Sequence, residues 1–282
     1  WGWTSLPNMS LFLLSIISLI TFIGWEKKIP HPLVELTLFK NLTFTTLFSV
    51  LLIIQAVAIV FVFLAIFLQN VLHYSPLMAG LLLLPAMVPI MLMAPVGGHL
   101  RDKYGPTLPM FCGALLVVLS LIWIAIFSHN RGYAWLFPGL LVYGIGMPLI
   151  LSGIMATVMN MVNAQQRGMA SAIFNCARQF GNTIGLALLT GLLASVNKWQ
   201  LNSFLHHSPV PLSRLKEQQI DGLLVQSDQA MKAIAHLSLA HIELLKTAAL
   251  NAYTNAFSMT LLAAAILAFL SLFLILKIPR KQ

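Results

Sequence analysis

The chain has 282 residues, of which 59% are hydrophobic and only 8% are charged, and its mean hydropathy is +0.89. A soluble domain carries about 25% charged residues, so this composition excludes an ordinary soluble globular protein. The formal net charge of +9 does not indicate a nucleic-acid-binding protein, because the basic residues lie mainly in short segments between apolar runs, where they report membrane topology.

Seven segments of the chain are long and apolar enough to cross a bilayer, whose hydrocarbon core of about 30 Å needs about 20 residues of α-helix. Inside a bilayer no water satisfies the backbone, so each segment must be helical. We therefore predict an all-α polytopic membrane protein with seven transmembrane helices, at residues 9–25, 44–69, 76–99, 107–128, 134–162, 168–197 and 251–277.

The first apolar segment ends at Trp25 and is followed by charged residues and then by Pro30 and Pro32, which cannot continue a helix. This boundary predicts a single transmembrane helix within residues 1–28, a cytoplasmic linker at 29–43 and a six-helix bundle at 44–282. The chain begins without an initiator methionine. We expect it to be one half of a larger protein, or a fragment of one.

The basic residues divide the chain into two membrane sides. Short loops rich in Lys and Arg face the cytoplasm, whereas the charges of long loops have little influence on membrane orientation. We therefore expect residues 26–43, 100–107, 163–168 and the C-terminus to be cytoplasmic, and the long segment 198–250 to be an extracytoplasmic loop. Its apolar spacing predicts one or two amphipathic helices lying on the outer membrane surface.

Glycine and proline are frequent in two of the predicted helices, 76–99 and 134–162. Such residues allow helices to kink and to approach one another closely, and they favour helices that move in a transporter, although simple packing explains them as well. We predict close helix packing at Gly144, Gly146, Gly181 and Gly185, the last two forming a G-x-x-x-G pair.

Arg178 is the only charged residue deep within a predicted helix, where an unpaired charge is expensive. Asn175, Arg178 and Asn182, together with Gly185, share one helical face, and Gln179 is adjacent. We predict a polar face that lines a cavity; the alternative is an arginine bonded to carbonyl groups of a neighbouring helix. Gln55, in the middle of 44–69, is a further candidate cavity residue.

The sequence indicates no enzyme, metal or cofactor chemistry. It contains no phosphate-binding loop, metalloprotease signature or nucleophile arrangement, and Cys112 and Cys176 lie in separate apolar helices, so no disulfide framework is expected. All seven acidic residues fall in predicted loops. A proton relay usually needs an embedded carboxylate or histidine, so this chain alone has no evident proton carrier.

One segment resembles a family signature. Gly98-His-Leu-Arg-Asp-Lys-Tyr-Gly105 is similar to the motif between the second and third helices of a half of the major facilitator superfamily, with the basic pair that usually follows replaced by Pro106-Thr107. The resemblance implies that this segment is a conformational-switch loop. The matching residues are Gly98, Leu100, Asp102, Lys103 and Gly105.

Two further stretches resemble the fourteen-helix drug:proton antiporters of the EmrB/QacA type. The first stretch, at 1–5, 25–26 and 32–40, resembles the region that leads into the second half of these transporters. The second resembles the fifth helix of that half and comprises 167–171, Asn175, Arg178, Gln179, Gly181 and Gly185. The resemblance implies that 9–25 is the second of two linker helices and that 44–277 is the C-terminal six-helix bundle. The N-terminal six helices, which carry the antiport motif and the embedded acids of that family, would then be missing.

This resemblance implies the C-terminal half of a secondary-active multidrug efflux transporter that works by alternating access and proton antiport in the bacterial cytoplasmic (inner) membrane. The implied partners are a hydrophobic or amphipathic small molecule, the proton, the lipid bilayer, the missing N-terminal half and a periplasmic adaptor.

The sequence leaves two other functions open and argues against a third. The same fold could export a specific metabolite, lipid or siderophore, or the chain could be a non-transporting membrane subunit. A seven-helix retinal protein would need a lysine in its last helix, and residues 253–276 contain none.

Overall fold

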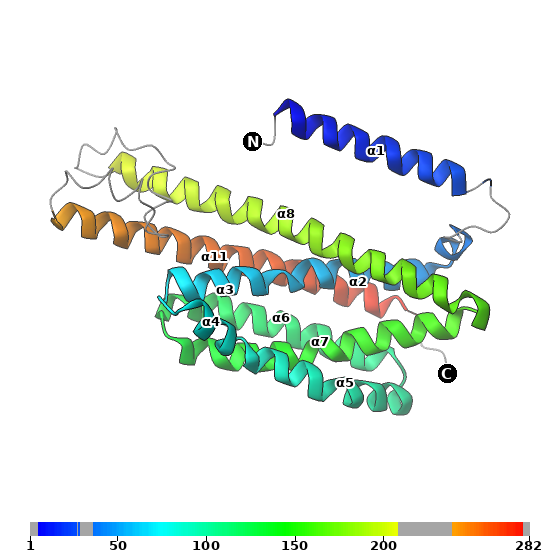
Figure 1. Ribbon diagram of the computed structural model, residues 1–282. Helices are drawn as coiled ribbons and strands as arrows, with labels where there is room; N and C mark the ends of the chain where they lie inside the picture. The colour runs from blue at the N-terminus through cyan, green and yellow to red at the C-terminus, as the bar shows by residue number, and fades with distance from the viewer. Residues whose placement is uncertain (1–4, 27, 29–35, 208–238, 279–282) are drawn as a thin grey trace.

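The computed structural model describes residues 5–26, 28, 36–207 and 239–278, and in these ranges all regular structure is helical (Figure 1). Seven helical segments are long and apolar enough to cross a membrane, which confirms the predicted all-α polytopic fold. They are Leu6–Glu26, Leu42–Asn70, Pro76–Tyr104, Thr107–Asn130, Tyr133–Met161, Ala164–Phe204 and Ile242–Leu276.

Two of these spans are broken helices. The described elements are α1 (Leu6–Glu26), η1 (Leu36–Lys40), α2 (Leu42–Ala58), α3 (Val60–Asn70), α4 (Pro76–Leu82), α5 (Leu84–Tyr104), α6 (Thr107–Phe127), η2 (Ser128–Asn130), α7 (Tyr133–Met161), η3 (Ala164–Gln166), α8 (Arg167–His207) and α11 (Leu239–Leu276). The breaks separate α2 from α3 and α4 from α5.

Helix boundaries follow local side-chain chemistry. The Asn41 side chain accepts hydrogen bonds from the backbone of Thr43 and Phe44 and so caps the start of α2. Ser75 caps α4 in the same way, with Pro76 at the first helical position. Helix α5 ends at Gly105, whose φ of 77° is a conformation that residues with a side chain rarely adopt.

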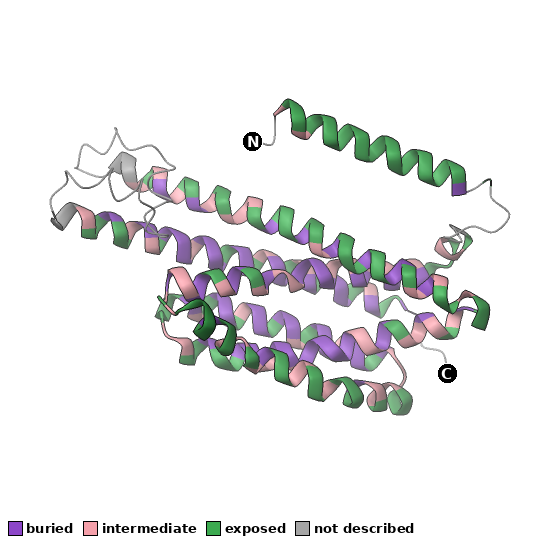
Figure 2. Ribbon diagram, in the orientation of Figure 1, coloured by how far each residue is buried: buried purple, intermediate pink, exposed green. Residues whose placement is uncertain are grey.

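The bundle is built around α2, α3, α6, α7 and α11, which hold most of the buried side chains (Figure 2). Helix α5 packs against α7, and α8 packs against α2 and α11. Aromatic side chains join the layers: Phe67 of α3 stacks on Phe257 of α11 with ring centroids 4.4 Å apart, and Phe44 of α2 meets Phe174 of α8 edge to face.

Helix α1 lies apart from this bundle, and its residues are exposed except Asn8, which is partly buried, and Glu26 at its end (Figure 2). A helix that is apolar on every side suits contact with lipid. The observed arrangement is therefore one separate helix plus six membrane-spanning segments, as predicted. Residues 29–35 of the predicted linker at 29–43 lie outside the described residues.

Several helices are longer than predicted. Helix α5 runs to Tyr104, so the predicted switch loop is helical up to that residue. Helix α8 extends to His207 and α11 begins at Leu239, so both ends of the predicted outer loop at 198–250 are helical. A 41-residue helix is about 60 Å long, twice the hydrocarbon thickness. Helices therefore continue into the polar region, where the prediction ended them. The expected surface helices fall largely on 208–238, outside the described residues.

The prediction that all acidic residues lie in loops is wrong for the same reason. Glu26, Asp102 and Glu243 are helical, each close to an end of α1, α5 or α11. None of the three lies in the middle of a described membrane span.

Candidate functional site

Helix α8 has one polar, open face. The residues predicted to line a cavity on this helix lie around a single shallow pocket of about 550 Å³. The lining residues are Asn175, Cys176, Arg178, Gln179, Phe180, Asn182 and Thr183. The opposite face of α8 packs on the bundle through Phe174, Ala177 and Gly181, which are buried. Helical spacing thus separates a polar face from a packing face.

Arg178 is exposed on this face. Within the described ranges it has neither an acidic partner nor a hydrogen bond to a neighbouring helix. An arginine in mid-membrane is tolerated when it faces a water-filled cavity or a protein partner. This part of α8 is therefore poorly suited to face lipid.

The packing face of α8 is shaped by two glycines. A Cβ atom at Gly181 would lie 2.6 Å from the Leu52 carbonyl oxygen of α2, and one at Gly185 would overlap the carbonyl of Ala56. Gly185 therefore lies against α2, although the helical spacing placed it on the same face as Arg178. That assignment is corrected, because the backbone of α2 fills the space beside Gly185.

Helix α7 makes similar close contacts on two sides. A Cβ atom at Gly144 would overlap the Ala86 carbonyl of α5, and one at Gly146 would lie 2.7 Å from the carbonyl oxygen of Gly113 in α6. Small residues let helix backbones approach this closely in membranes. The four glycines singled out by the sequence all lie at such contacts.

Gln55 is not on the open face. It is 5% exposed and lies between α2 and α8, where its Cβ would be 2.8 Å from a Cβ added at Gly181. The assignment of Gln55 to the cavity is corrected, because the approach of α8 that Gly181 permits covers this part of α2. The error arose because the sequence does not say which face of α2 the neighbouring helix covers.

The family-like segment forms about the last two turns of α5 and the turn into α6. Arg101 donates two hydrogen bonds to one carboxylate oxygen of Asp102, at 2.9 and 2.6 Å, while the Lys103 ammonium lies 5.2 Å from the ring centre of Tyr104. The Asp102 side chain is 67% exposed. Its second carboxylate oxygen has no partner among the described residues and remains available to another surface.

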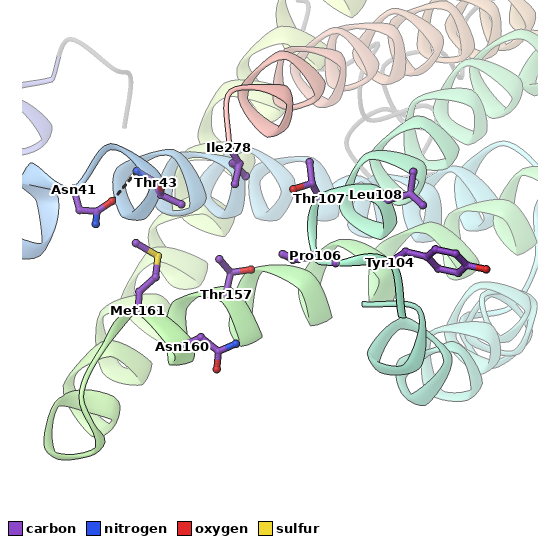
Figure 3. A pocket seen from close by; sticks show the side chains of 11 residues that line it. Asn41, Thr43, Tyr104, Pro106, Thr107, Leu108, Thr157, Asn160, Met161 and Ile278 are labelled. Atoms are coloured by element: carbon purple, nitrogen blue, oxygen red, sulfur yellow. Dashed lines mark hydrogen bonds between the residues drawn. The ribbon is translucent and has the colours of Figure 1, made fainter. Parts of the chain in front are cut away.

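A larger cavity of about 750 Å³ lies beside this turn (Figure 3). It was not predicted, because four separate parts of the chain contribute to it: the start of α2, the α5–α6 turn, the end of α7 and Ile278. The lining residues are Asn41, Thr43, Tyr104, Gly105, Pro106, Thr107, Leu108, Thr157, Asn160, Met161 and Ile278. Segments expected on the cytoplasmic side thus meet at one end of the bundle.

The other end of the bundle carries a polar network that the sequence did not reveal. His129 hydrogen-bonds to Asn255 at 2.8 Å, and Asn255 donates to Gln200 of α8 at 3.0 Å. Arg131 donates to Asn251 of α11. These bonds join η2, α8 and α11, the segments expected on the outer side.

The sequence model of the Major Facilitator Superfamily matches residues 2–186 of the chain. The chain belongs to this superfamily. Multidrug resistance protein Stp of Mycobacterium tuberculosis is 31% identical over 215 residues, which are 76% of this chain and 40% of Stp. The superfamily assignment and the seven apolar helices together make this a multi-pass membrane protein of a transporter family rather than of an enzyme family.

Other relatives in the superfamily align over similar or longer stretches. The tetracenomycin C resistance and export protein of Streptomyces glaucescens is 26% identical over 69% of this chain and 36% of its own length. Multidrug transporter protein MdtP of Bacillus subtilis is 24% identical over 97% of this chain and 53% of its own. The chain thus spans about half the length, or less, of the curated relatives it matches.

A solved structure supports the superfamily fold. A bacterial homologue of the human lysosomal transporter Spinster, crystallised in an inward-facing and occupied conformation, superposes with a TM-score of 0.60. The match covers 84% of this chain and 49% of the homologue at 16% identity. At this identity the likeness concerns the fold alone.

Proposed function

We propose that this chain is the C-terminal half of a secondary-active multidrug efflux transporter of the bacterial cytoplasmic membrane. The single observation that carries the proposal is the open polar face of α8, with Arg178 exposed and unpaired among the described residues. A charged group at this depth is suited to a water-accessible substrate path between two halves of a transporter.

The relatives support the drug-export part of the proposal. Stp and MdtP are named for multidrug resistance or transport, and the Streptomyces relative for resistance and export. The substrate we propose is a hydrophobic or amphipathic small molecule. Export of one specific metabolite, lipid or siderophore is the second candidate, and no described residue favours it.

The proposed partner of the open α8 face is the N-terminal half of the same transporter. The described spans contain no carboxylate in mid-membrane, so we assign the proton-carrying acids of a drug:proton antiporter of the EmrB/QacA type to that half. Helix α1, which is exposed along its length, fits a linker helix between the halves. We assign the contact with a periplasmic adaptor to the outer end of the bundle.

Drug resistance in cells tests the proposal. The complete reading frame that contains this chain, expressed in an efflux-deficient bacterium, is expected to raise the tolerated concentration of several unrelated lipophilic drugs. The 282 residues alone are expected to give no resistance, because they supply one side of the path. Resistance from the 282 residues alone, or none from the complete frame at matched membrane abundance, would contradict the proposal.

We further propose that Asp102 acts as a switch that binds the opposite half in one conformational state. Asp102→Asn is expected to reduce drug efflux several-fold while leaving the melting temperature unchanged, because an exposed ion pair contributes about 0–1 kcal/mol. Arg101→Gln is the matched control, since it removes the same local ion pair but keeps the carboxylate. Equal losses of efflux in both variants would reduce the role of Asp102 to its pairing with Arg101.

A further inference from the structure

The first membrane span of the bundle breaks at Ile59, between α2 and α3, where no proline or glycine is present. The amide of Ile59 donates to the Val57 carbonyl and the amide of Val62 donates to Ile59, in place of acceptors four residues back. Tightened turns within a helix often mark a hinge.

The second broken span provides a contrast. Its break at Leu83 precedes Pro85, which has no amide hydrogen to donate, so the sequence explains this break. The Tyr133 hydroxyl donates to the Leu82 carbonyl at 2.8 Å and so satisfies a polar group beside the break. The break at Leu83 is therefore explained by its sequence and surroundings, whereas the sequence gives no such reason for the break at Ile59.

Tyr143 of α7 lies at a depth similar to that of Ile59. It is ten residues from the start of α7 at Tyr133, and Ile59 is eleven residues from the end of α3 at Asn70, about 15 Å from the same end of the bundle in each case. Tyr143 is only 2% exposed, and its hydroxyl has no hydrogen-bond partner among the described residues. Buried hydroxyls without a partner are uncommon, because each loses its bonds to water.

Phe61, in the first turn of α3, packs against the Tyr143 ring. The two rings meet edge to face with centroids 4.8 Å apart, and Phe61 is half-buried whereas Tyr143 is almost fully enclosed. Phe61 is only two residues beyond the break at Ile59. A pivot of α3 at Ile59 would therefore move the Phe61 ring relative to α7 and expose the hydroxyl.

We propose that the Tyr143 hydroxyl is a concealed substrate-binding group, uncovered when α3 pivots at Ile59 and carries Phe61 away. Once uncovered, it would donate a hydrogen bond to a carbonyl or ether oxygen of an apolar substrate, a bond that strengthens in surroundings poor in water. This inference rests on the proposed drug-export function and deepens it, because it names an acceptor group that transported molecules should carry.

Transport of two lipophilic cations by the intact transporter tests this role. Rhodamine 6G carries ester and ether oxygens, whereas tetraphenylphosphonium has no acceptor. Tyr143→Phe is expected to raise the KM for rhodamine 6G by about 3–10-fold, which corresponds to the loss of one hydrogen bond. The KM for tetraphenylphosphonium should stay unchanged. Tyr253→Phe is the matched control, because the Tyr253 hydroxyl is also buried without a partner among the described residues but lies on α11.

The outcomes separate this inference from the proposed function. No transport of either cation by the wild type would overturn both. Wild-type transport with unchanged or equally reduced transport of both cations in Tyr143→Phe would overturn the inference alone. Melting temperature gives a second readout: Tyr143→Phe should raise it, because an unsatisfied hydroxyl is removed. A lower melting temperature would mean that the hydroxyl has a structural partner, and would also overturn the inference.

Cysteine labelling tests whether Phe61 shields position 143 from a thiol reagent. In the intact transporter with its other cysteines replaced, including Cys112 and Cys176, a Tyr143→Cys variant should react slowly with N-ethylmaleimide. Adding Phe61→Ala should accelerate the reaction several-fold. Val62→Ala is the control, because Val62 is the exposed neighbour of Phe61. Equal rates with and without Phe61→Ala would show that Phe61 does not cover this position.

Discussion

Replacing Arg178 by alanine is expected to reduce drug efflux by the intact transporter on the order of 10-fold, while membrane abundance stays close to that of the wild type. The reason is the position of the side chain, which is exposed on the open face of α8 and forms no salt bridge or hydrogen bond to another described helix. Efflux of a fluorescent drug, divided by the amount of transporter in the membrane, is the measurement.

Two control variants define the role of Arg178. Arg178→Lys keeps the charge and should retain more activity than Arg178→Ala. Leu188→Ala, at an exposed position of the same helix outside the polar face, should leave efflux unchanged. If Arg178→Ala lowers abundance while efflux per molecule is preserved, Arg178 is a packing residue and the cavity assignment is wrong.

Substitution at Gly185 is expected to have the largest effect on stability. A Cβ atom there would overlap the Ala56 carbonyl, so Gly185→Ala must push α8 away from α2. Overpacking of this kind typically destabilises a protein by about 1–3 kcal/mol. We expect a lower melting temperature of the detergent-solubilised transporter, together with lower efflux, because α8 carries the polar face.

Gly191 is the matched control on the same helix. A Cβ atom at Gly191 would meet nothing within 4 Å, and alanine is favoured over glycine in a helix by about 1 kcal/mol. Gly191→Ala should therefore leave the melting temperature unchanged or raise it. If both substitutions shift the melting temperature in the same direction and by the same amount, the packing of α8 on α2 at Gly185 is not as described.

The sequence predicted the membrane spans well because crossing a bilayer depends on the length of an apolar segment, which can be read without knowledge of tertiary contacts. The polar face of α8 was predictable for a related reason: Asn175, Arg178, Gln179 and Asn182 lie on one helix, and helical spacing alone brings them together. Both predictions rest on local geometry.

Features that depend on which helices are neighbours could not be predicted. The sequence does not say which face of α2 a neighbour covers, so Gln55 was placed in the cavity although α8 buries it. The end cavity near Thr107 and the outer network around Asn255 each combine distant segments. The extent of α5 was missed because charged residues such as Asp102 continue a helix readily once it has left the hydrocarbon.

The central proposal is that the chain forms one side of a proton-driven drug path lined by α8. Drug uptake into everted membrane vesicles tests this proposal most directly. In vesicles containing the intact transporter, respiration should drive accumulation of a fluorescent lipophilic drug, and an agent that collapses the proton gradient should abolish it. Vesicles with the Arg178→Ala variant at equal abundance should accumulate much less. Uptake that equals that of transporter-free vesicles, or that is the same in wild type and Arg178→Ala, would contradict the account.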